Sequence, residues 1–138
     1  MKKTLFIFIG FSIILSAGLN RSVAGIVTDS ITKLQWQDEY IGVIKIDNWQ
    51  NAINYCEGLS LGGYTDWRLP NINELLSIVD DTKFNPSINS AFTNTSTNYY
   101  WSGTTGINNT LYAWIINFND GNLDYRIKTP NRYIRCVR

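Results

Sequence analysis

The chain has 138 residues, with 12 basic and 11 acidic side chains and a formal net charge of +1. It contains no histidine, which excludes Ser-His-Asp and Cys-His catalysis and removes the most usual zinc ligand. The nearly neutral charge gives no reason to expect a nucleic acid or an acidic membrane as a partner.

The first 24 residues have the pattern of a secretory signal peptide. Lys2 and Lys3 precede an apolar run over residues 5–15, and small residues stand before a cleavage point after Ala24. No later segment approaches the roughly 20 apolar residues that a membrane span needs. A retained N-terminal anchor is the alternative. We therefore expect residues 1–24 to be removed and the protein to be secreted, periplasmic or on the cell surface, without membrane insertion.

Residues 25–138 are then the mature chain, 138 − 24 = 114 residues, which is the size of a single domain. Loss of Lys2, Lys3 and Arg21 leaves 12 − 3 = 9 basic against 11 acidic side chains, a net charge of about −2. Such a chain is long enough to bury a hydrophobic core without a metal. No P-loop, dinucleotide fingerprint or EF-hand loop appears, so no metal and no cofactor is expected. Calcium bound by the acidic residues is the alternative, although the sequence lacks the triplets usual in Ca²⁺-dependent lectins.

The first elements expected in this domain are a short hairpin and a helix. Apolar runs at 26–28 and 34–36 flank a turn. Asp47, with Gln50 at the reciprocal capping position, predicts a helix start. Apolar residues follow at helical spacing, namely Trp49, Ala52, Ile53, Cys56 and Leu59. The two glycines at 62–63 can adopt the positive φ that ends a helix.

A second helix is predicted from Asn71 to about Val79. Pro70 cannot continue a preceding helix, and Asn71 with Glu74 three residues later forms a capping-box pattern. The apolar residues that follow lie on one stripe.

The connector between these helices carries Trp67 and Arg68, where a polar and variable loop is more usual. A large aromatic ring and a cation with five donors favour a buried, hydrogen-bonded corner over a loose loop. We expect this structural corner to comprise Asp66, Trp67, Arg68 and Glu74, with Arg135 as a further buried partner of one of the two carboxylates.

The second half of the domain has the pattern of strands. Residues 80–97 show no period and are rich in Asn, Ser and Thr, which predicts a long ordered loop. Runs at 112–118 and 123–127 are separated by a turn containing Asp-Gly, which is a strong hairpin signal. A last strand is expected at 133–137. Helices early and strands late favour an α+β fold.

The two cysteines, Cys56 and Cys136, both lie in the mature chain. In an oxidising compartment an isolated, widely separated pair favours a disulfide. Two free or catalytic thiols are the alternative, although the pair lacks the C-x-x-C spacing of redox motifs.

Several motifs in a fixed order resemble one bacterial family. They are VTDSITKLQWQD, the helix with Cys56, WRLPNINEL, TNYYWSGT, YAWIINFNDG and YIRCVR, and together they cover about 27–138. The family is a domain of unknown function seen as the C-terminal domain of the Legionella collagen-like adhesin. The adhesin's collagen stalk has no counterpart here, because this sequence has no Gly-X-Y repeat.

The resemblance implies a C-type-lectin-like fold. In that fold two helices pack on an antiparallel sheet, the N- and C-terminal strands pair, and a long loop region follows. It also implies extracellular placement and, from the adhesin, binding of sulfated polysaccharides. The formylglycine-generating enzymes share this broad fold but need a reactive cysteine pair, so the resemblance does not favour an enzyme.

Aromatic rings beside amides form the first candidate for a ligand site, because a sugar can stack on an exposed ring while amides bind its hydroxyls. Strand alternation places Tyr100 and Trp101 on opposite faces, so one of them is expected to be exposed. The alternative is that most of these rings belong to the core. The candidate residues are Tyr99, Tyr100, Trp101, Asn117, Asn119 and Asp120.

Basic residues near the C-terminus form the second candidate. Five of the nine mature basic side chains fall within 126–138, and Arg126 and Lys128 share one strand face, as do Arg132 and Arg138. Guanidinium groups there could hold sulfate or carboxylate groups. The alternatives are plain solvated charge for Arg126, Lys128 and Arg132, and a structural role for Arg135.

Three classes of function remain. The first is a secreted, non-enzymatic module that binds extracellular, sulfated or acidic polysaccharide in adhesion. The second is protein–protein recognition by a component of a surface assembly. The third is an enzyme using paired carboxylates such as Asp120 and Asp124, although neighbouring acids are more often capping or solvated groups. The expected partner is therefore an extracellular glycan or a surface protein.

Overall fold

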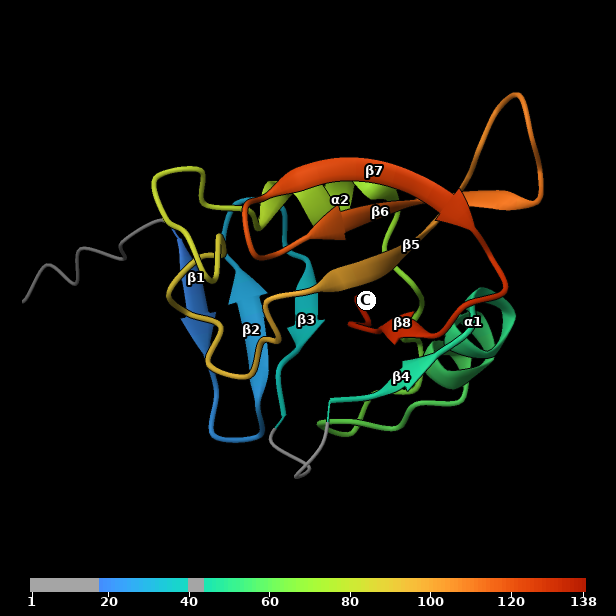
Figure 1. Ribbon diagram of the computed structural model, residues 1–138. Coiled ribbons are helices and arrows are strands. Elements are labelled where there is room, and N and C mark those ends of the chain that lie inside the picture. Colours follow the sequence, from blue (N-terminus) through green and yellow to red (C-terminus); the bar gives the residue numbers. More distant parts are fainter. Residues whose placement is uncertain (1–17, 40–43) are drawn as a thin grey trace, which may run out of the picture.

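The computed structural model describes residues 18–39 and 44–138 and has an α+β fold, as expected (Figure 1). A three-stranded antiparallel sheet has the order β1-β2-β3, and a five-stranded sheet has the order β4-β8-β5-β6-β7. The strands are β1 (Leu19–Arg21), β2 (Ile26–Asp29), β3 (Gln35–Gln37), β4 (Ile46–Asp47), β5 (Tyr99–Thr105), β6 (Tyr112–Asn117), β7 (Asn122–Ile127) and β8 (Arg132–Tyr133). The helices are α1 (Trp49–Glu57) and α2 (Ile72–Ser77).

The larger sheet is mixed rather than wholly antiparallel, which corrects one expectation. β8 runs parallel to β5, while the other pairs are antiparallel. The hairpin β6–β7 brings the chain back into the direction of β5. The chain then bends through the short connection 128–131 into β8, where Tyr133 pairs with Tyr100 of β5.

Residues 1–17 of the expected signal peptide lie outside the described residues. The last part of that segment forms β1, which pairs with β2 in the register Arg21↔Val27. Arg21 also contacts the Asp38 carboxylate at 3.3 Å. Cleavage after Ala24 would cut this hairpin at its turn and leave β2 and β3 with their remaining partners.

Both helices begin on asparagine caps. The side-chain oxygen of Asn48 accepts from the Asn51 N–H at 3.0 Å, so the cap of α1 is Asn48 and not Asp47. Asp47 instead accepts from the backbone N–H of Asn48. In α2 the predicted capping box is confirmed, because Asn71 accepts from Glu74 N–H at 2.9 Å and Glu74 accepts from Asn71 N–H at 2.8 Å.

The glycine pair at 62–63 does not end α1. That helix ends at Gly58, whose N–H donates to the Asn54 carbonyl. Gly62 and Gly63 have φ of 63° and 83° and form a tight turn in which Leu61 and Tyr64 exchange backbone hydrogen bonds. The positive φ predicted for Gly62 and Gly63 is therefore present, but it forms the turn that follows α1 and not the end of the helix.

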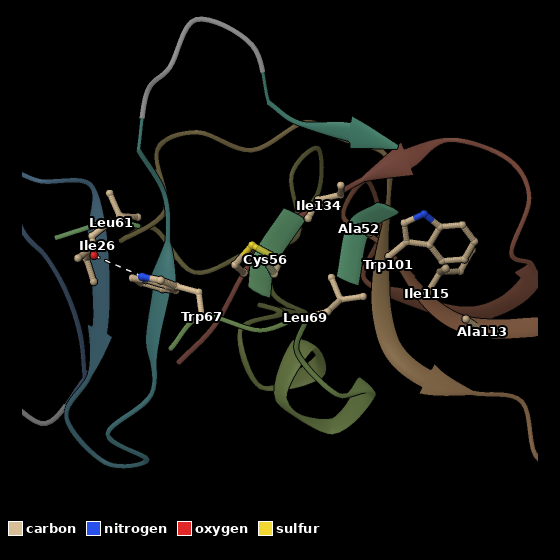
Figure 2. Packing of buried hydrophobic residues seen from close by; sticks show 11 residues of the cluster. Ile26, Ala52, Cys56, Leu61, Trp67, Leu69, Trp101, Ala113, Ile115 and Ile134 are labelled. Atoms are coloured by element: carbon tan, nitrogen blue, oxygen red, sulfur yellow. Dashed lines mark hydrogen bonds between the residues drawn. A yellow bond between two sulfur atoms is a disulfide. The ribbon is translucent and has the colours of Figure 1, made fainter. Parts of the chain in front are cut away.

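The hydrophobic core has two parts, one on each face of the larger sheet. On β5 and β6, Trp101, Ala113 and Ile115 point to one face and pack with Ala52 and Cys56 of α1, as Figure 2 shows. The alternate residues Tyr100, Ile116 and Phe118 point to the opposite face. There they pack with Leu75 of α2 and with Ile78, its C-cap. The central strand β5 is therefore covered on both sides.

The C-terminal segment ties the two sheets together. Cys136 forms a disulfide with Cys56 of α1, with the two Cα atoms 5.5 Å apart, so the predicted pairing is present. Val137 bridges Trp36 of β3 on one side and Arg68 on the other. The first and last strands were expected to pair. Instead β1 pairs with β2 and β8 with β4 and β5, and the C-terminal residues beyond β8 reach β3 through the Trp36–Val137 bridge.

The predicted corner is built around a buried indole. Trp67 is buried, and its Nε1 donates to the Leu61 and Tyr64 carbonyls at 3.3 and 3.2 Å (Figure 2). Arg68 donates from both Nη1 and Nη2 to the Glu74 carboxylate at 2.7 Å.

Two other residues expected at this corner have different partners. Asp66 accepts from Arg138 Nε at 2.6 Å. Arg135 is buried, as expected, but its carboxylate partner is Asp38, 97 positions away in sequence, and neither Asp66 nor Glu74. Pairing across such a separation depends on the tertiary fold, which local sequence patterns do not encode.

The Arg68–Glu74 pair gives a pH-dependent prediction. The hydrogen bonds from Arg68, with that from Asn71, hold the pKa of Glu74 below its usual 4.5. A lowered pKa stabilises the fold above about pH 4.5, and this contribution disappears as the pH falls through the lower folded-state value. Glu74→Gln should therefore melt below the wild type at neutral pH, and thermal scans should show the gap closing in acid. A gap of equal size at both pH values would contradict this.

Candidate binding surface

Three basic residues gather on the α1 side of the larger sheet. Arg126 lies opposite Ala113 in the β6–β7 register, and Ala113 points to the α1 side, so Arg126 does too. Lys128 follows two residues later and lies over the ring of Trp49, at the start of α1. Arg132 of β8 lies near Arg126, whose charge acts on it. We call Arg126, Lys128 and Arg132, with Tyr99 and Trp49, the basic face.

Arg132 rests on aromatic rings. Its Cζ is 5.1 Å from the ring centre of Tyr99 and 5.3 Å from that of Trp101. Burial, and next the positive charge of Arg126, lower the pKa of Arg132 below its usual value. Its Nε is buried and has no hydrogen-bond partner among the described residues. Arg132 is therefore a charged group held in place chiefly by packing.

Lys128 and Trp49 line an open hollow of ≈ 480 Å³ together with Asn48, Gln50 and Thr129. The Lys128 Nζ is 3.5 Å from the Trp49 ring centre and donates to Thr105 Oγ1 at 2.9 Å. Burial lowers the pKa of Lys128 below its usual 10.5. The hollow thus combines a cation, an aromatic ring and amide groups.

Trp49 is the residue of this surface that sequence reasoning missed. Helical spacing assigned it to the buried stripe of α1, but it is the first residue of the helix and is only half-buried. Its indole N–H donates to the Ser102 carbonyl at 2.8 Å, which fixes the ring. The sequence did contain a signal for this exposure, because Trp49 directly follows the helix cap and lies at the end of the apolar stripe.

The charges of the basic face are only partly balanced. Arg126 pairs with Asp124, two residues before it on the same strand. Within 18–39 and 44–138, neither Lys128 nor Arg132 forms an ion pair with a carboxylate. Asp47 lies opposite Arg132 in the β4–β8 register but pairs with Lys45 at 3.4 Å. With that pair included, four cations and two carboxylates leave an excess of two positive charges on a domain whose overall charge is close to neutral.

The expectation that Tyr100 or Trp101 is exposed was wrong. Both are 0% exposed. Alternation correctly places them on opposite faces of β5, but α1 covers one face and α2 the other. Of this aromatic triplet, Tyr99 at the start of the strand is the half-buried member and the one that reaches the basic face.

The amide candidates lie at the opposite end of β7 from Lys128, about 20 Å along the strand. Asn117 accepts from the Asn119 N–H at 3.0 Å, and Asp120 accepts from the Asn122 N–H at 3.1 Å. These side chains shape the β6–β7 turn. The structure therefore separates Asn119 and Asp120 from the cations, while Asn117 stays beside Tyr99 in the strand register.

Arg138 does not share a face with Arg132, contrary to expectation. It pairs with Asp66 and lies 3.6 Å from the ring centre of Tyr64. The chain leaves the larger sheet after β8, and its last residues join β3 instead. Arg135 and Arg138 are thus structural, and the basic face keeps the other three.

Among the described residues, no helix is long and apolar enough to cross a membrane. No curated protein matches the chain. A family model does match it over residues 25–138, which is the whole predicted mature segment. The chain therefore belongs to the Lcl C-terminal domain family, the family of the C-terminal domain of a collagen-like adhesin, and is an adhesion-related domain.

Proposed function

We propose that this domain is a secreted, non-enzymatic binding module with a C-type-lectin-like fold that recognises acidic or sulfated extracellular polysaccharide in adhesion. The observation that carries the proposal is the basic face. There two cations without carboxylate partners among the described residues, Lys128 and Arg132, lie against the rings of Trp49 and Tyr99.

The chemistry of this surface suits an acidic sugar. A guanidinium can bind a sulfate or carboxylate through two parallel hydrogen bonds, and an ammonium adds a compact point charge. The half-buried rings offer apolar contact to a pyranose, and Asn48 and Gln50 lie beside Trp49 to bind hydroxyls. Arg132 is already partly desolvated by its neighbours, so an anion there replaces little hydration.

Retention on an immobilised heparin-type polymer tests this proposal. The wild type should be retained at low ionic strength and released by modest salt, because the contacts are largely ionic. Arg126→Glu with Lys128→Glu should weaken binding about tenfold or more, the equivalent of about 1.4 kcal/mol. Lys33→Glu with Lys83→Glu is the matched control, since it reverses two exposed lysines elsewhere and should leave retention closer to that of the wild type.

Equal loss in both double variants would show that only net charge matters, and would contradict a defined basic face. Retention that survives both salt and the Arg126/Lys128 reversal would also contradict it.

One observation favours protein recognition as the second candidate. The loop between β5 and β6 exposes Ile107 at 95% and Leu111 at 64%. Apolar side chains displayed in this way suit contact with a protein surface better than contact with an acidic sugar. No hit on a glycan array, together with a surface protein whose capture is lost in Ile107→Ser, would favour this alternative.

A further inference from the structure

Strand β7 lies at the edge of the larger sheet, where it arches over the top of Figure 1. In the described part of the chain, no strand pairs with its outer side. The Lys128 N–H, directly after β7, donates to the carbonyl of Leu111, directly before β6. Because hydrogen-bonded pairs alternate along an antiparallel ladder, every second residue of β7 before Lys128 bonds to β6 and the residues between them do not. The backbone groups of Leu123, Tyr125 and Ile127 therefore point away from β6. Those of Tyr125 have local partners on the same strand, because its N–H donates to Asp124 Oδ1 at 2.8 Å and its carbonyl accepts from Arg126 Nη1 at 3.4 Å.

The same three residues carry an exposed apolar stripe. Leu123 is 46%, Tyr125 44% and Ile127 40% exposed. Tyr125 also packs on two aromatic rings of β6, with ring centres 5.2 Å from Tyr112 and 5.5 Å from Trp114. Outward-pointing backbone groups beside apolar side chains on a strand without proline are the features that lead an edge strand to pair with another chain.

The sequence of β7 is complementary to itself. If two copies of Asn122–Ile127 align antiparallel with Tyr125 opposite Tyr125, each Leu123 faces an Ile127. Each Asp124 then faces an Arg126 on the other side of the sheet. This register makes Leu123, Tyr125 and Ile127 the hydrogen-bonded positions, and these are the residues whose backbone groups point away from β6. At Tyr125, pairing would exchange the local bonds to Asp124 and Arg126 for bonds across the axis.

We propose that β7 is the interface of a two-fold homodimer, in which two larger sheets join edge to edge with Tyr125 at the axis. The occupant of this edge is a second copy of the chain, because in the antiparallel self-pairing apolar positions face apolar ones and each charged position faces an opposite charge.

The proposed pairing has a consequence for the basic face. The two-fold axis of an antiparallel strand pair stands perpendicular to the sheet, so the same face of each copy lies on the same side. The α1 sides of both copies then present Arg126, Lys128 and Arg132 together. An extended polyanion could contact both, and its binding would gain from the effective concentration of the second site.

A charge-exchange experiment on the full secreted chain tests the dimer. Asp124→Lys alone sets an introduced ammonium against Arg126 of the other copy, and Arg126→Glu alone sets an introduced carboxylate against Asp124. Like charges then face each other across the axis, so each variant should sediment as a monomer. An equal mixture restores both attractive pairs and should sediment at twice the monomer mass, as the wild type does. Analytical ultracentrifugation over a concentration series, without polysaccharide, reads this directly.

Leu123→Ser should shift the wild-type dimer to monomer, while Ile107→Ser, an equally apolar loss away from β7, should not. A wild type that stays monomeric at the highest concentration overturns the proposal, as does a dimer unaffected by any β7 variant. Failure of the mixture to restore the dimer overturns the register. Leu123→Ser leaves the charges of the basic face unchanged. Its effect on the dimer therefore tests the β7 interface separately from the heparin-retention test of the basic face.

Discussion

Replacing Cys56 and Cys136 together with alanine should lower the free energy of unfolding by about 4–5 kcal/mol. The disulfide closes a loop of 80 residues, and its removal returns that chain entropy to the unfolded state. A domain of this size has a total stability of about 5–15 kcal/mol, so the loss is a large part of it. We expect the melting temperature to fall by about 15–30 °C, measured by circular dichroism.

The reduced wild type is the control for this change. It keeps both buried sulfur atoms and loses only the cross-link, so its melting temperature should fall nearly as far as that of the double variant. If reduction leaves the melting temperature unchanged, the link between α1 and the C-terminal segment contributes little to the fold.

Asp38→Ala should lower the free energy of unfolding by about 3–5 kcal/mol, because it leaves the buried guanidinium of Arg135 without its carboxylate. The Asp38 side chain is fully buried and accepts from Arg135 Nη1 at 3.0 Å. It also accepts from the Thr93 N–H at 2.9 Å and the Asn94 N–H at 3.2 Å. One side chain thus fixes β3, the loop before β5 and the C-terminal segment.

Two comparisons make this prediction specific. Glu74→Ala breaks the more exposed Arg68 pair and should cost less than about 1 kcal/mol. Asp38→Leu with Arg135→Met removes both charges and should cost less than Asp38→Ala alone. Denaturant midpoints measure all three, and an Asp38→Ala variant no less stable than Glu74→Ala would contradict the account.

Local features of the fold could be predicted from the sequence because their causes are local. The capping box of Asn71 and Glu74 needs only residues three apart, and the β6–β7 hairpin needs only its turn and the flanking alternation. The disulfide followed from the compartment and the cysteine count.

Features that depend on tertiary packing could not be predicted. Strand alternation correctly placed Tyr100 and Trp101 on opposite faces of β5. Whether each face is covered depends on helices elsewhere in the chain. The partner of Arg135 lies 97 positions away. The same limit applies to the candidate site. Residue spacing predicted that Arg132 and Arg138 share a face, but the chain turns away after β8 and separates them. Arg132 lies near Arg126 instead.

The basic face is tested most directly by nuclear magnetic resonance titration with a defined sulfated oligosaccharide. We expect shifts of the Trp49 indole N–H and of the backbone amides at Arg126, Lys128 and Arg132, all lost together as salt is raised. Shifts confined to the loop around Ile107 and Leu111, or no shifts at low ionic strength, would contradict it.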